Sequence, residues 1–366
     1  MRWARDRSSS AGGLGPGRRV GLPGAPQRHH VAKRPGGAVQ CDLCPRHCVI
    51  PEGQAGDCRV RINRGGVLYA VTYGRPCAIH LDPVEKKPMF HFLPGTSILS
   101  VATAGCNLHC KNCQNWSISQ ADPETVRVLS WTQGEYGVSP KRLVNLAAAR
   151  QVPSIAYTYT DPNIFYEYAY DTARFAHASG IKNVTVTAGY IEEKPLRRLA
   201  RYVDGSNVDI KTMNPRFFEE NCGGQLHYVL DGLVVARQEG IWIEVTNLVI
   251  PTMNDDPAET KKLCQWVLKY LGPDTPLHFS RFYPHHQLRN LPSTPVETLI
   301  RARDIARDVG LHFVYIGNVQ GRDFESTFCP TCGKKVIGRV GYTITVNNLK
   351  DGKCGFCGHP IPGVWK

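Results

Sequence analysis

Between residues 97 and 320 the sequence alternates short apolar runs with longer amphipathic stretches, a pattern that few folds accommodate. The apolar runs are rich in Val, Ile and aromatic residues and are bounded by turn residues, as β-strands are. They predict strands at 97–103, 154–159, 183–188, 207–212, 242–250, 276–283 and 311–317. The amphipathic stretches between them predict helices at 140–151, 163–179, 193–203, 226–239, 256–271 and 295–309.

Strand–helix alternation of this kind predicts an α/β fold with a parallel sheet. Six or seven units favour a partial (β/α)6-type TIM barrel over the usual eight-unit barrel, with a doubly wound open sheet as the alternative. In a barrel of this kind the chemistry gathers at the carboxyl ends of the strands. Asp161 and Lys211 follow or end two of the predicted strands, and Asp209 lies within one.

The first 40 residues differ in composition from the rest of the chain. They hold eight Lys or Arg residues against one acidic residue, Asp6, so they supply +7 of the formal net charge of +13. Twelve of them are Gly or Pro, which is typical of segments that do not pack. We expect residues 1–40 to form a disordered basic tail, and the modest charge of the remainder gives little reason to expect a nucleic-acid partner.

Fourteen cysteines are many for 366 residues, and most stand in short clusters. No stretch approaches about 18 uncharged apolar residues, so no membrane span is predicted. The N-terminus lacks the apolar run of a signal peptide. Clustered cysteines without an export signal favour metal binding in a reducing cytoplasm. The clusters divide the chain into a cysteine-rich segment at 41–96, the α/β region at 97–320 and a second cysteine-rich module at 321–366.

The most informative cluster is Cys106, Cys110 and Cys113, which directly follows the first predicted strand. Thiolates are soft ligands suited to iron–sulfur clusters. A four-iron cluster needs four ligands and this loop supplies three, so one iron stays open and S-adenosylmethionine (SAM) can chelate it. The alternative, a structural zinc, usually takes four protein ligands in a closed site.

The residues around this triplet resemble those of the AmmeMemoRadiSam system radical SAM enzymes, a family related to pyruvate formate-lyase activating enzymes. The resemblance covers about residues 38–366. The matching segments are Cys41–Cys48, Ala104–Leu108, Cys113–Ser119, Ala156–Tyr159, Ile164–Tyr168, Val208–Lys211 and Leu248–Pro251.

The resemblance implies a partial barrel of the radical SAM kind, with a [4Fe–4S] cluster held by the triplet and SAM as cofactor. The implied activity is reductive cleavage of SAM to a 5′-deoxyadenosyl radical that abstracts hydrogen from an unidentified substrate, either a protein or another molecule. The implied partners are a reductant such as ferredoxin or flavodoxin and companion proteins of the same system.

The resemblance also assigns five residues to the cofactor. Asp161, in the segment Tyr159–Pro162 that matches the family's acidic motif, stands where relatives have a longer acid that receives the SAM amino group. Thr187 ends the third predicted strand, where relatives place ligand-facing polar groups. Asp209 and Lys211 match a segment near SAM and substrate, although a buried structural ion pair is the alternative.

One position departs from the family's pattern. Asn112 replaces the aromatic residue that usually packs near the adenine before the third cysteine. Trp116, four residues further along the chain, is the candidate to supply the stacking instead. The departure concerns adenine packing and leaves cluster ligation unaffected.

The flanking groups suggest further metals. Cys329, Cys332, Cys354 and Cys357 form two Cys-x-x-Cys pairs 21 residues apart, the spacing of a zinc ribbon, with Gly333, Gly355 and Gly358 where knuckle turns need a positive φ. Cys41, Cys44, Cys48 and Cys58 suffice for a zinc or a closed auxiliary cluster, with free thiols or a redox pair as alternatives.

Two other functional classes fit parts of the sequence. A zinc-dependent nucleic-acid-binding module with a basic tail would account for the C-terminal pairs and the charge, but binding alone gives no reason for the triplet at a strand end. A thiol–disulfide oxidoreductase would need a Cys-x-x-Cys at a helix N-terminus. The four-cysteine groups fit metals better.

Overall fold

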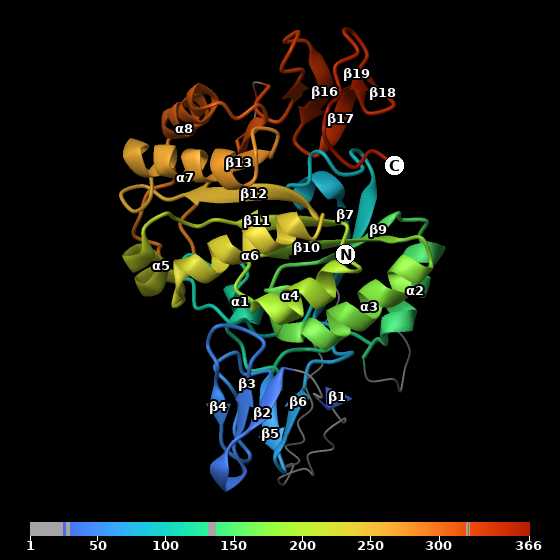
Figure 1. The fold of residues 1–366 in the computed structure, drawn as a ribbon, viewed down its shortest axis with the longest axis vertical. Helices are drawn as coiled ribbons and strands as arrows, with labels where there is room; N and C mark the ends of the chain where they lie inside the picture. The colour runs from blue at the N-terminus through green and yellow to red at the C-terminus, as the bar shows by residue number, and fades with distance from the viewer. Residues whose placement is uncertain (1–24, 27–29, 131–136, 320, 322) are drawn as a thin grey trace, which may run out of the picture.

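The structure is a computed structural model that describes residues 25–26, 30–130, 137–319, 321 and 323–366 (Figure 1). Most of the predicted basic tail lies outside the described residues. Its predicted end at residue 40 differs from the structure, because β2 (Val31–Lys33) pairs antiparallel with β3 (Val39–Cys41). The turn between them, Pro35–Gly37, uses glycines with positive φ, so the Gly/Pro content here marks a tight connection and not a disordered chain.

The centre of the molecule is an eight-stranded sheet in the order β14-β13-β12-β11-β10-β9-β8-β7. All strands from β8 to β14 run parallel, and β7 lies antiparallel at one edge. The bounds are β7 Ala78–Pro83, β8 Ser97–Ala102, β9 Ser154–Tyr157, β10 Lys182–Thr187, β11 Gly205–Asp209, β12 Trp242–Val249, β13 Leu277–Arg281 and β14 Val314–Gly317. This sequential order, without the reversal of a doubly wound sheet, confirms the predicted α/β class.

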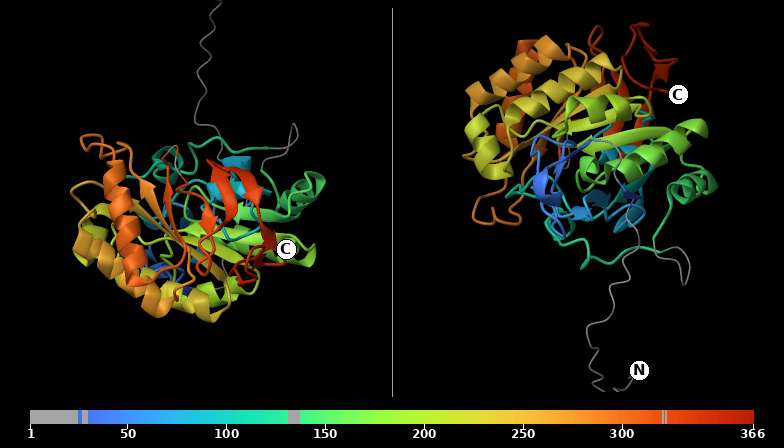
Figure 2. Two further views of the ribbon diagram at one scale, coloured as in Figure 1. Left: turned by 90° about the horizontal axis from the view of Figure 1, so that it is seen from above. Right: turned by 60° about the horizontal axis from the view of Figure 1, so that its bottom comes forward.

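Each crossover between parallel strands contains a helix, as predicted. The helices are α2 (Pro140–Ala149), α3 (Tyr166–Ala178), α4 (Glu193–Ala200), α6 (Leu226–Gln238), α7 (Pro257–Tyr270) and α8 (Val296–Val309). Figure 2 shows these helices in an arc along one side of the sheet. Leu263 and Val267 of α7 pack there against Val245, Leu277 and Phe279 of the strands, in the largest buried apolar cluster.

Two short helices were not predicted. One is α1 (Trp116–Ser119), directly after the cysteine triplet. The other is α5 (Pro215–Cys222), which the side chain of Asn214 caps by accepting from the backbone N–H of Arg216, and which ends at Gly223 with φ +71°. Asn, Pro and Gly are the residues that favour these positions at a helix start and end, so the local sequence contained this signal.

Two smaller modules flank the sheet at opposite ends of the molecule (Figure 1). The N-terminal module, residues 30–70, contains β2, β3, β4 (Val49–Ile50), β5 (Arg61–Arg64) and β6 (Val67–Ala70), and β6 also pairs with β1 (Ala25–Pro26). The C-terminal module, residues 323–366, contains β15 (Thr327–Phe328), β16 (Lys335–Val340), β17 (Thr343–Asn347), β18 (Leu349–Lys350) and β19 (Lys353–Cys354).

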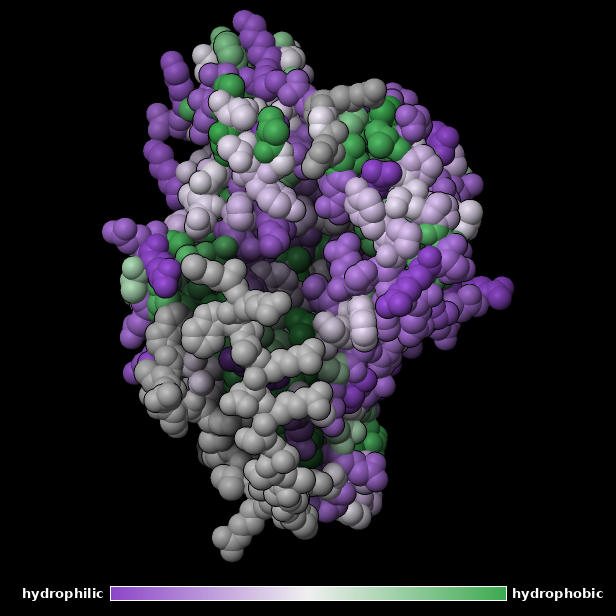
Figure 3. All heavy atoms as spheres, turned by 180° about the vertical axis from the view of Figure 1, so that it is seen from behind, coloured by the Kyte–Doolittle hydropathy of each residue, from purple (hydrophilic) through white to green (hydrophobic). Residues whose placement is uncertain are grey.

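On the face opposite to that of Figure 1, most of the visible surface is hydrophilic (Figure 3). Hydrophobic residues gather in a central hollow and in smaller patches near the edge. Among the residues that the structure describes, no helix has the length and apolar character needed to cross a membrane.

Glu244 of β12 connects the sheet to the segment that leads from β7 to β8. Its side chain is completely buried and accepts hydrogen bonds from the backbone N–H groups of Phe90 (2.9 Å) and His91 (2.7 Å). Nε2 of His278, on β13, lies 2.7 Å from the same carboxylate. One buried acid therefore binds three groups from two other parts of the chain, which is how a buried charge becomes tolerable.

We expect Glu244→Ala to destabilise the fold by about 3 kcal/mol or more, because it leaves several buried donors without an acceptor. Urea unfolding followed by circular dichroism measures the loss. Glu124→Ala, which removes an exposed carboxylate, is the matched control and should change stability little. Equal stabilities of the two variants would show that Glu244 does not organise this region.

Candidate functional site

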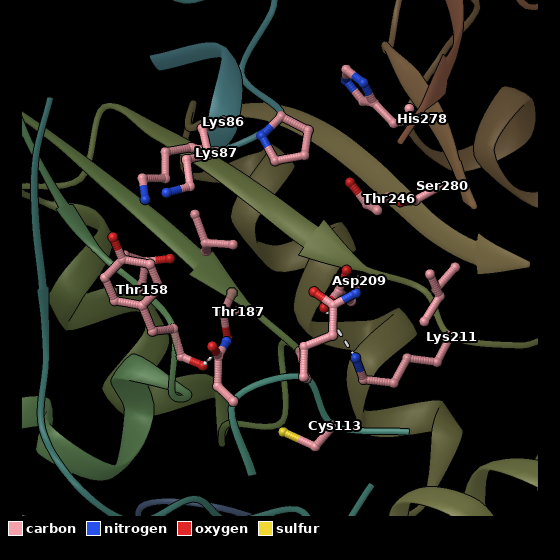
Figure 4. Close-up of a pocket in the computed structure, with 18 of the residues that line it drawn as sticks. Lys86, Lys87, Cys113, Thr158, Thr187, Asp209, Lys211, Thr246, His278 and Ser280 are labelled. Atoms are coloured by element: carbon pink, nitrogen blue, oxygen red, sulfur yellow. Dashed lines mark hydrogen bonds and ion pairs between the residues drawn. The ribbon is translucent and has the colours of Figure 1, made fainter. Parts of the chain in front are cut away.

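A cavity of about 520 Å³ lies at the carboxyl edge of the parallel sheet. Residues at or after the ends of all seven parallel strands contribute to its wall, where a barrel places its chemistry. The main contributors, several of which appear in Figure 4, are Cys106, Cys110, Cys113, Tyr159, Asp161, Thr187, Asp209, Lys211, Thr246, His278, Ser280 and Asn318. The three predicted cluster ligands and all five predicted SAM contacts thus face one space.

The triplet loop leaves β8 through Gly105, whose φ of +96° suits glycine. A Cβ at this position would lie 2.6 Å from Cγ1 of Val60 and 2.8 Å from the carbonyl oxygen of Cys58, so the loop packs directly on the N-terminal module. Further on, the N–H of Cys113 donates to the carbonyl of Cys110 (3.1 Å), closing a turn between two of the thiols.

Helix α5 holds the loop from the other side. The N–H of His109 donates to the carbonyl of Cys222, and that of Lys111 to the carbonyl of Asn221, both at 2.9 Å. The thiols of Cys222 and Cys110 are also hydrogen-bonded to each other. Sequence analysis could not place Cys222 beside the triplet, because the contact depends on an unpredicted helix folding back over the loop.

The surroundings of the triplet favour protonated thiols. The pKa of Cys110 is raised first by its hydrogen bond with Cys222 and then by burial. Burial raises the pKa of the Cys106 thiol and that of the Cys113 thiol, although Ser119 Oγ, 3.2 Å from the Cys113 sulfur, opposes the second shift. Buried thiols stay protonated unless a cation replaces their protons. Three convergent soft donors beside an open cavity fit a four-iron cluster that keeps one position free of protein ligands.

Asp161 follows β9 and is 5% exposed. One carboxylate oxygen accepts from the N–H of Asn163 (3.0 Å), and the other from the N–H of Ala188 (2.9 Å) and the hydroxyl of Thr187 (3.0 Å). Burial raises the pKa of Asp161, while these donors oppose the rise. Since a carboxylate has about four acceptor positions, one remains for a ligand in the cavity.

Asp209 and Lys211 form the ion pair that the sequence left open as an alternative. Lys211 Nζ lies 3.0 Å from a carboxylate oxygen of Asp209, and Figure 4 shows the lysine directed at this partner. Burial opposes the lysine charge, but Asp209 and the nearby Cys110 outweigh it and raise the pKa of Lys211. The pair is structural and also borders the cavity, so the two interpretations are compatible.

The aromatic residues occupy different positions from those the family pattern suggests. The ring of Trp116 stacks on His286 (centroids 5.2 Å apart) and is absent from the cavity wall. Asn112 lines the cavity, and its side-chain oxygen accepts from Asn221 at 3.0 Å. Trp116 therefore does not supply the missing stacking partner in this structure.

Tyr159 lines the cavity with an αL backbone, φ +65°. Its hydroxyl donates to the carboxylate of Asp82, which also binds Nζ of Lys87 at 2.6 Å. The Lys87 amine lies 4.4 Å from the centre of the Tyr159 ring. The polar end of Tyr159 is thus committed to a buried cluster on the cavity wall.

Several lining residues were not predicted. Lys86 and Lys87 follow β7, the unpredicted edge strand, and lie across the cavity from Cys113 (Figure 4). Glu325 and Tyr342 reach the cavity from the C-terminal module. Burial raises the pKa of Glu325 to about 7, so this carboxyl group titrates near neutrality. Their sequence neighbourhoods give no sign of this role, because it depends on how distant segments pack.

The C-terminal cysteines meet as predicted. The sulfur atoms of Cys329 and Cys357 are 3.6 Å apart, those of Cys332 and Cys354 are 3.7 Å apart, and all four lie within 4.8 Å of one another. Zn–S bonds of about 2.3 Å in a tetrahedron give separations of this size.

The knuckle glycines follow the prediction in part. Gly333 and Gly358 have positive φ. Gly355 does not have a positive φ, which corrects the prediction. A Cβ at Gly355 would lie 2.5 Å from the carbonyl oxygen of Asn348, so close backbone approach explains that glycine instead.

The four N-terminal cysteines surround a second, smaller cavity of about 20 Å³ on the far side of the triplet loop. Arg61 and Asn107 complete its wall. Asn107 belongs to the triplet loop itself, so the two cysteine sites are neighbours.

Comparison with known proteins gives a family and a close relative. Residues 100–264 match the Radical SAM superfamily. The uncharacterized protein MJ0808 of Methanocaldococcus jannaschii is 45% identical over 325 residues, which cover 88% of this chain and 95% of that protein.

Similar solved structures include a radical SAM methyltransferase from Sphaerobacter thermophilus, with 17% identity, a TM-score of 0.49 and coverage of 67% of this chain and 71% of that one. A domain of a pyruvate-formate lyase-activating enzyme from Bacteroides vulgatus has 16% identity, a TM-score of 0.39 and coverage of 44% and 98%. The identification of the family rests on the sequence matches.

Proposed function

Because the chain belongs to the radical SAM superfamily, we propose that Cys106, Cys110 and Cys113 hold a [4Fe–4S] cluster beside a bound SAM. When bound, the cluster supplies the electron that cleaves SAM to methionine and a 5′-deoxyadenosyl radical, which abstracts a hydrogen atom from the substrate. The observation that carries the proposal is the shared cavity of about 520 Å³, onto which all three thiols and the polar strand ends open.

Asp161 is proposed to receive the ammonium group of SAM. The backbone N–H of Ala188 and the hydroxyl of Thr187 hold one of its oxygens in place, so the carboxylate is oriented before the ligand arrives. Such pre-organisation lowers the entropy lost on binding. We propose that Thr187 acts by positioning Asp161.

Lys211 and Asp209 are proposed to interact with the cluster and SAM, on the side of the cavity where the triplet lies. The partly buried ammonium of Lys211 interacts electrostatically with Cys110 and would offset the negative charge of ligated thiolates. Asp209, about one-third exposed, offers an acceptor to a ligand in the cavity. Lys86, Lys87, His278 and Glu325 line other parts of the same cavity, which we propose as the space for the substrate.

We place the chain in the AmmeMemoRadiSam subfamily on its matching segments, several of which, including Val208–Lys211, border the cavity. The electron donor is proposed to be a ferredoxin or flavodoxin in a reducing cytoplasm. The four C-terminal cysteines are proposed to hold a structural zinc, on the separations of their sulfur atoms.

Replacing one cluster ligand tests the proposal. We expect Cys110→Ala to lose the iron of this site and to abolish the formation of 5′-deoxyadenosine from SAM with dithionite, while about one zinc per chain stays bound. Anaerobic reconstitution, metal analysis and chromatography of the products measure both effects. Cys264→Ala, which removes a buried thiol of α7 that does not line the cavity, should retain normal turnover. Normal turnover in Cys110→Ala would refute the cluster assignment.

Asp161→Asn should weaken SAM binding by about ten- to a hundredfold, because a hydrogen bond to a charged group is worth about 1.5–3 kcal/mol. Cluster assembly should continue, since Asp161 is not a ligand. Equilibrium binding of SAM and iron content are the two measurements. Asp171→Asn is the matched control, because Asp171 accepts from the Tyr73 hydroxyl away from the cavity. Loss of iron in Asp161→Asn would mean that the residue is structural.

A further inference from the structure

Cys41, Cys44, Cys48 and Cys58 converge on one small cavity inside the N-terminal module. Cys41 ends β3, Cys48 stands directly before β4, and Cys58 lies three residues before β5. Cys41 is 5% exposed and Cys58 is 9% exposed. Four thiols from separate turns that face one buried space form a closed ligand set.

The backbone fixes this convergence. The N–H of Cys41 donates to the carbonyl of Cys48 (2.9 Å), which pairs two of the thiol-bearing positions. His47 has φ +44°, and its N–H donates to the carbonyl of Cys44. A Cβ at Gly56 would lie 3.1 Å from Ile50 and 3.6 Å from the sulfur of Cys48, so this position leaves little room for a side chain.

Arg61 adds an observation that itself points to a ligand. Its side chain is 3% exposed and its terminal nitrogens bind Glu167 at 2.8 and 3.2 Å. Its Nε is buried and has no hydrogen-bond partner, although Arg61 lines the cysteine cavity. A buried donor without an acceptor is costly, and the sulfur atoms of an iron–sulfur cluster accept such hydrogen bonds.

The two groups of four cysteines differ in the spacing of their sulfur atoms. The C-terminal cysteines already stand at the separations that one zinc ion requires. Among the described residues, no three of the N-terminal cysteines come within 4.8 Å of one another in this way. In an iron–sulfur cluster each thiolate binds a different iron, so such a site does not require its ligands to stand as close as those of one zinc ion.

We propose that Cys41, Cys44, Cys48 and Cys58 hold a second iron–sulfur cluster, closed by four thiolates, which relays electrons to the triplet site. The relay rests on the proposed function of that site. The triplet loop is in contact with the N-terminal cysteine segment, because a Cβ at Gly105 would lie 2.8 Å from the carbonyl oxygen of Cys58. Arg46 also donates from Nε to the carbonyl of Asn107 (2.6 Å).

The relay step transfers one electron and neither forms nor breaks a bond. A one-electron donor protein of the ferredoxin or flavodoxin class reduces the second cluster. That cluster returns to its oxidised state when the electron passes to the triplet site. A cluster with four protein ligands has no open iron for a substrate, which suits electron transfer.

A triple variant, Cys106→Ala with Cys110→Ala and Cys113→Ala, isolates the second site. After anaerobic reconstitution we expect about four irons and four sulfides per chain, a visible absorption band, and an EPR signal on reduction with dithionite. The unaltered chain should hold about eight irons, and this measurement does not depend on the folding of any variant. Adding Cys41→Ser and Cys44→Ser to the triple variant should remove the remaining iron. Cys77→Ser, which lies in neither cavity wall, should not.

A triple variant that binds no iron would refute the second cluster, whether it holds one zinc ion per chain or two. This outcome is distinct from failure of the proposed function, which would appear as a chain that holds both clusters and forms no 5′-deoxyadenosine.

The double variant Cys44→Ser with Cys48→Ser tests the electron relay separately. With the first cluster intact, turnover should fall at least tenfold with flavodoxin as donor and much less with dithionite. Equal losses with both reductants would overturn the relay.

Discussion

The seating of the triplet loop is the constraint on which the rest of this structure depends. Gly105 packs on Val60 and Cys58 of the N-terminal module, and α5 holds the middle of the loop through Cys222. With the loop fixed on both sides, its thiols face the carboxyl edge of the sheet. The parallel order of the strands brings Asp161 and Lys211 to the same edge. A small displacement of this loop would separate the thiols from the residues proposed to bind SAM.

The charges around the cavity are held in place in advance of ligand binding. Lys211 pairs with Asp209, Lys87 pairs with Asp82, and Asp161 accepts hydrogen bonds from fixed donors. Paired buried charges avoid the cost of isolated ones and present defined fields to a ligand. Cys110 and Cys113 have only neutral hydrogen-bond partners, Cys222 and Ser119, and burial raises the pKa of Cys106. The cysteine loop is therefore the part of the cavity wall that a bound cation would stabilise most.

Local sequence predicted the elements of the sheet well, because seven apolar runs bounded by turn residues leave few alternatives. The sequence did not predict β7, an edge strand whose residues are largely exposed. It also did not predict α5, because this helix is short, although its capping residues were recognisable. The residues that line the cavity were predictable where motif and strand end coincide, as at Cys106 and Asp161. Positions where distant segments meet, such as Cys222 and Glu325, were not predictable, since those contacts depend on tertiary packing.

The central claim is that SAM binds at the triplet's open iron, and electron–nuclear double resonance on the reduced enzyme tests it directly. SAM labelled with ¹⁵N in its amino group and ¹⁷O in its carboxylate would be added to the protein. We expect hyperfine couplings from both labels to the cluster, and their loss when Cys113 is replaced by Ala. Spectra without coupling from either label, at SAM concentrations that saturate binding, would contradict it.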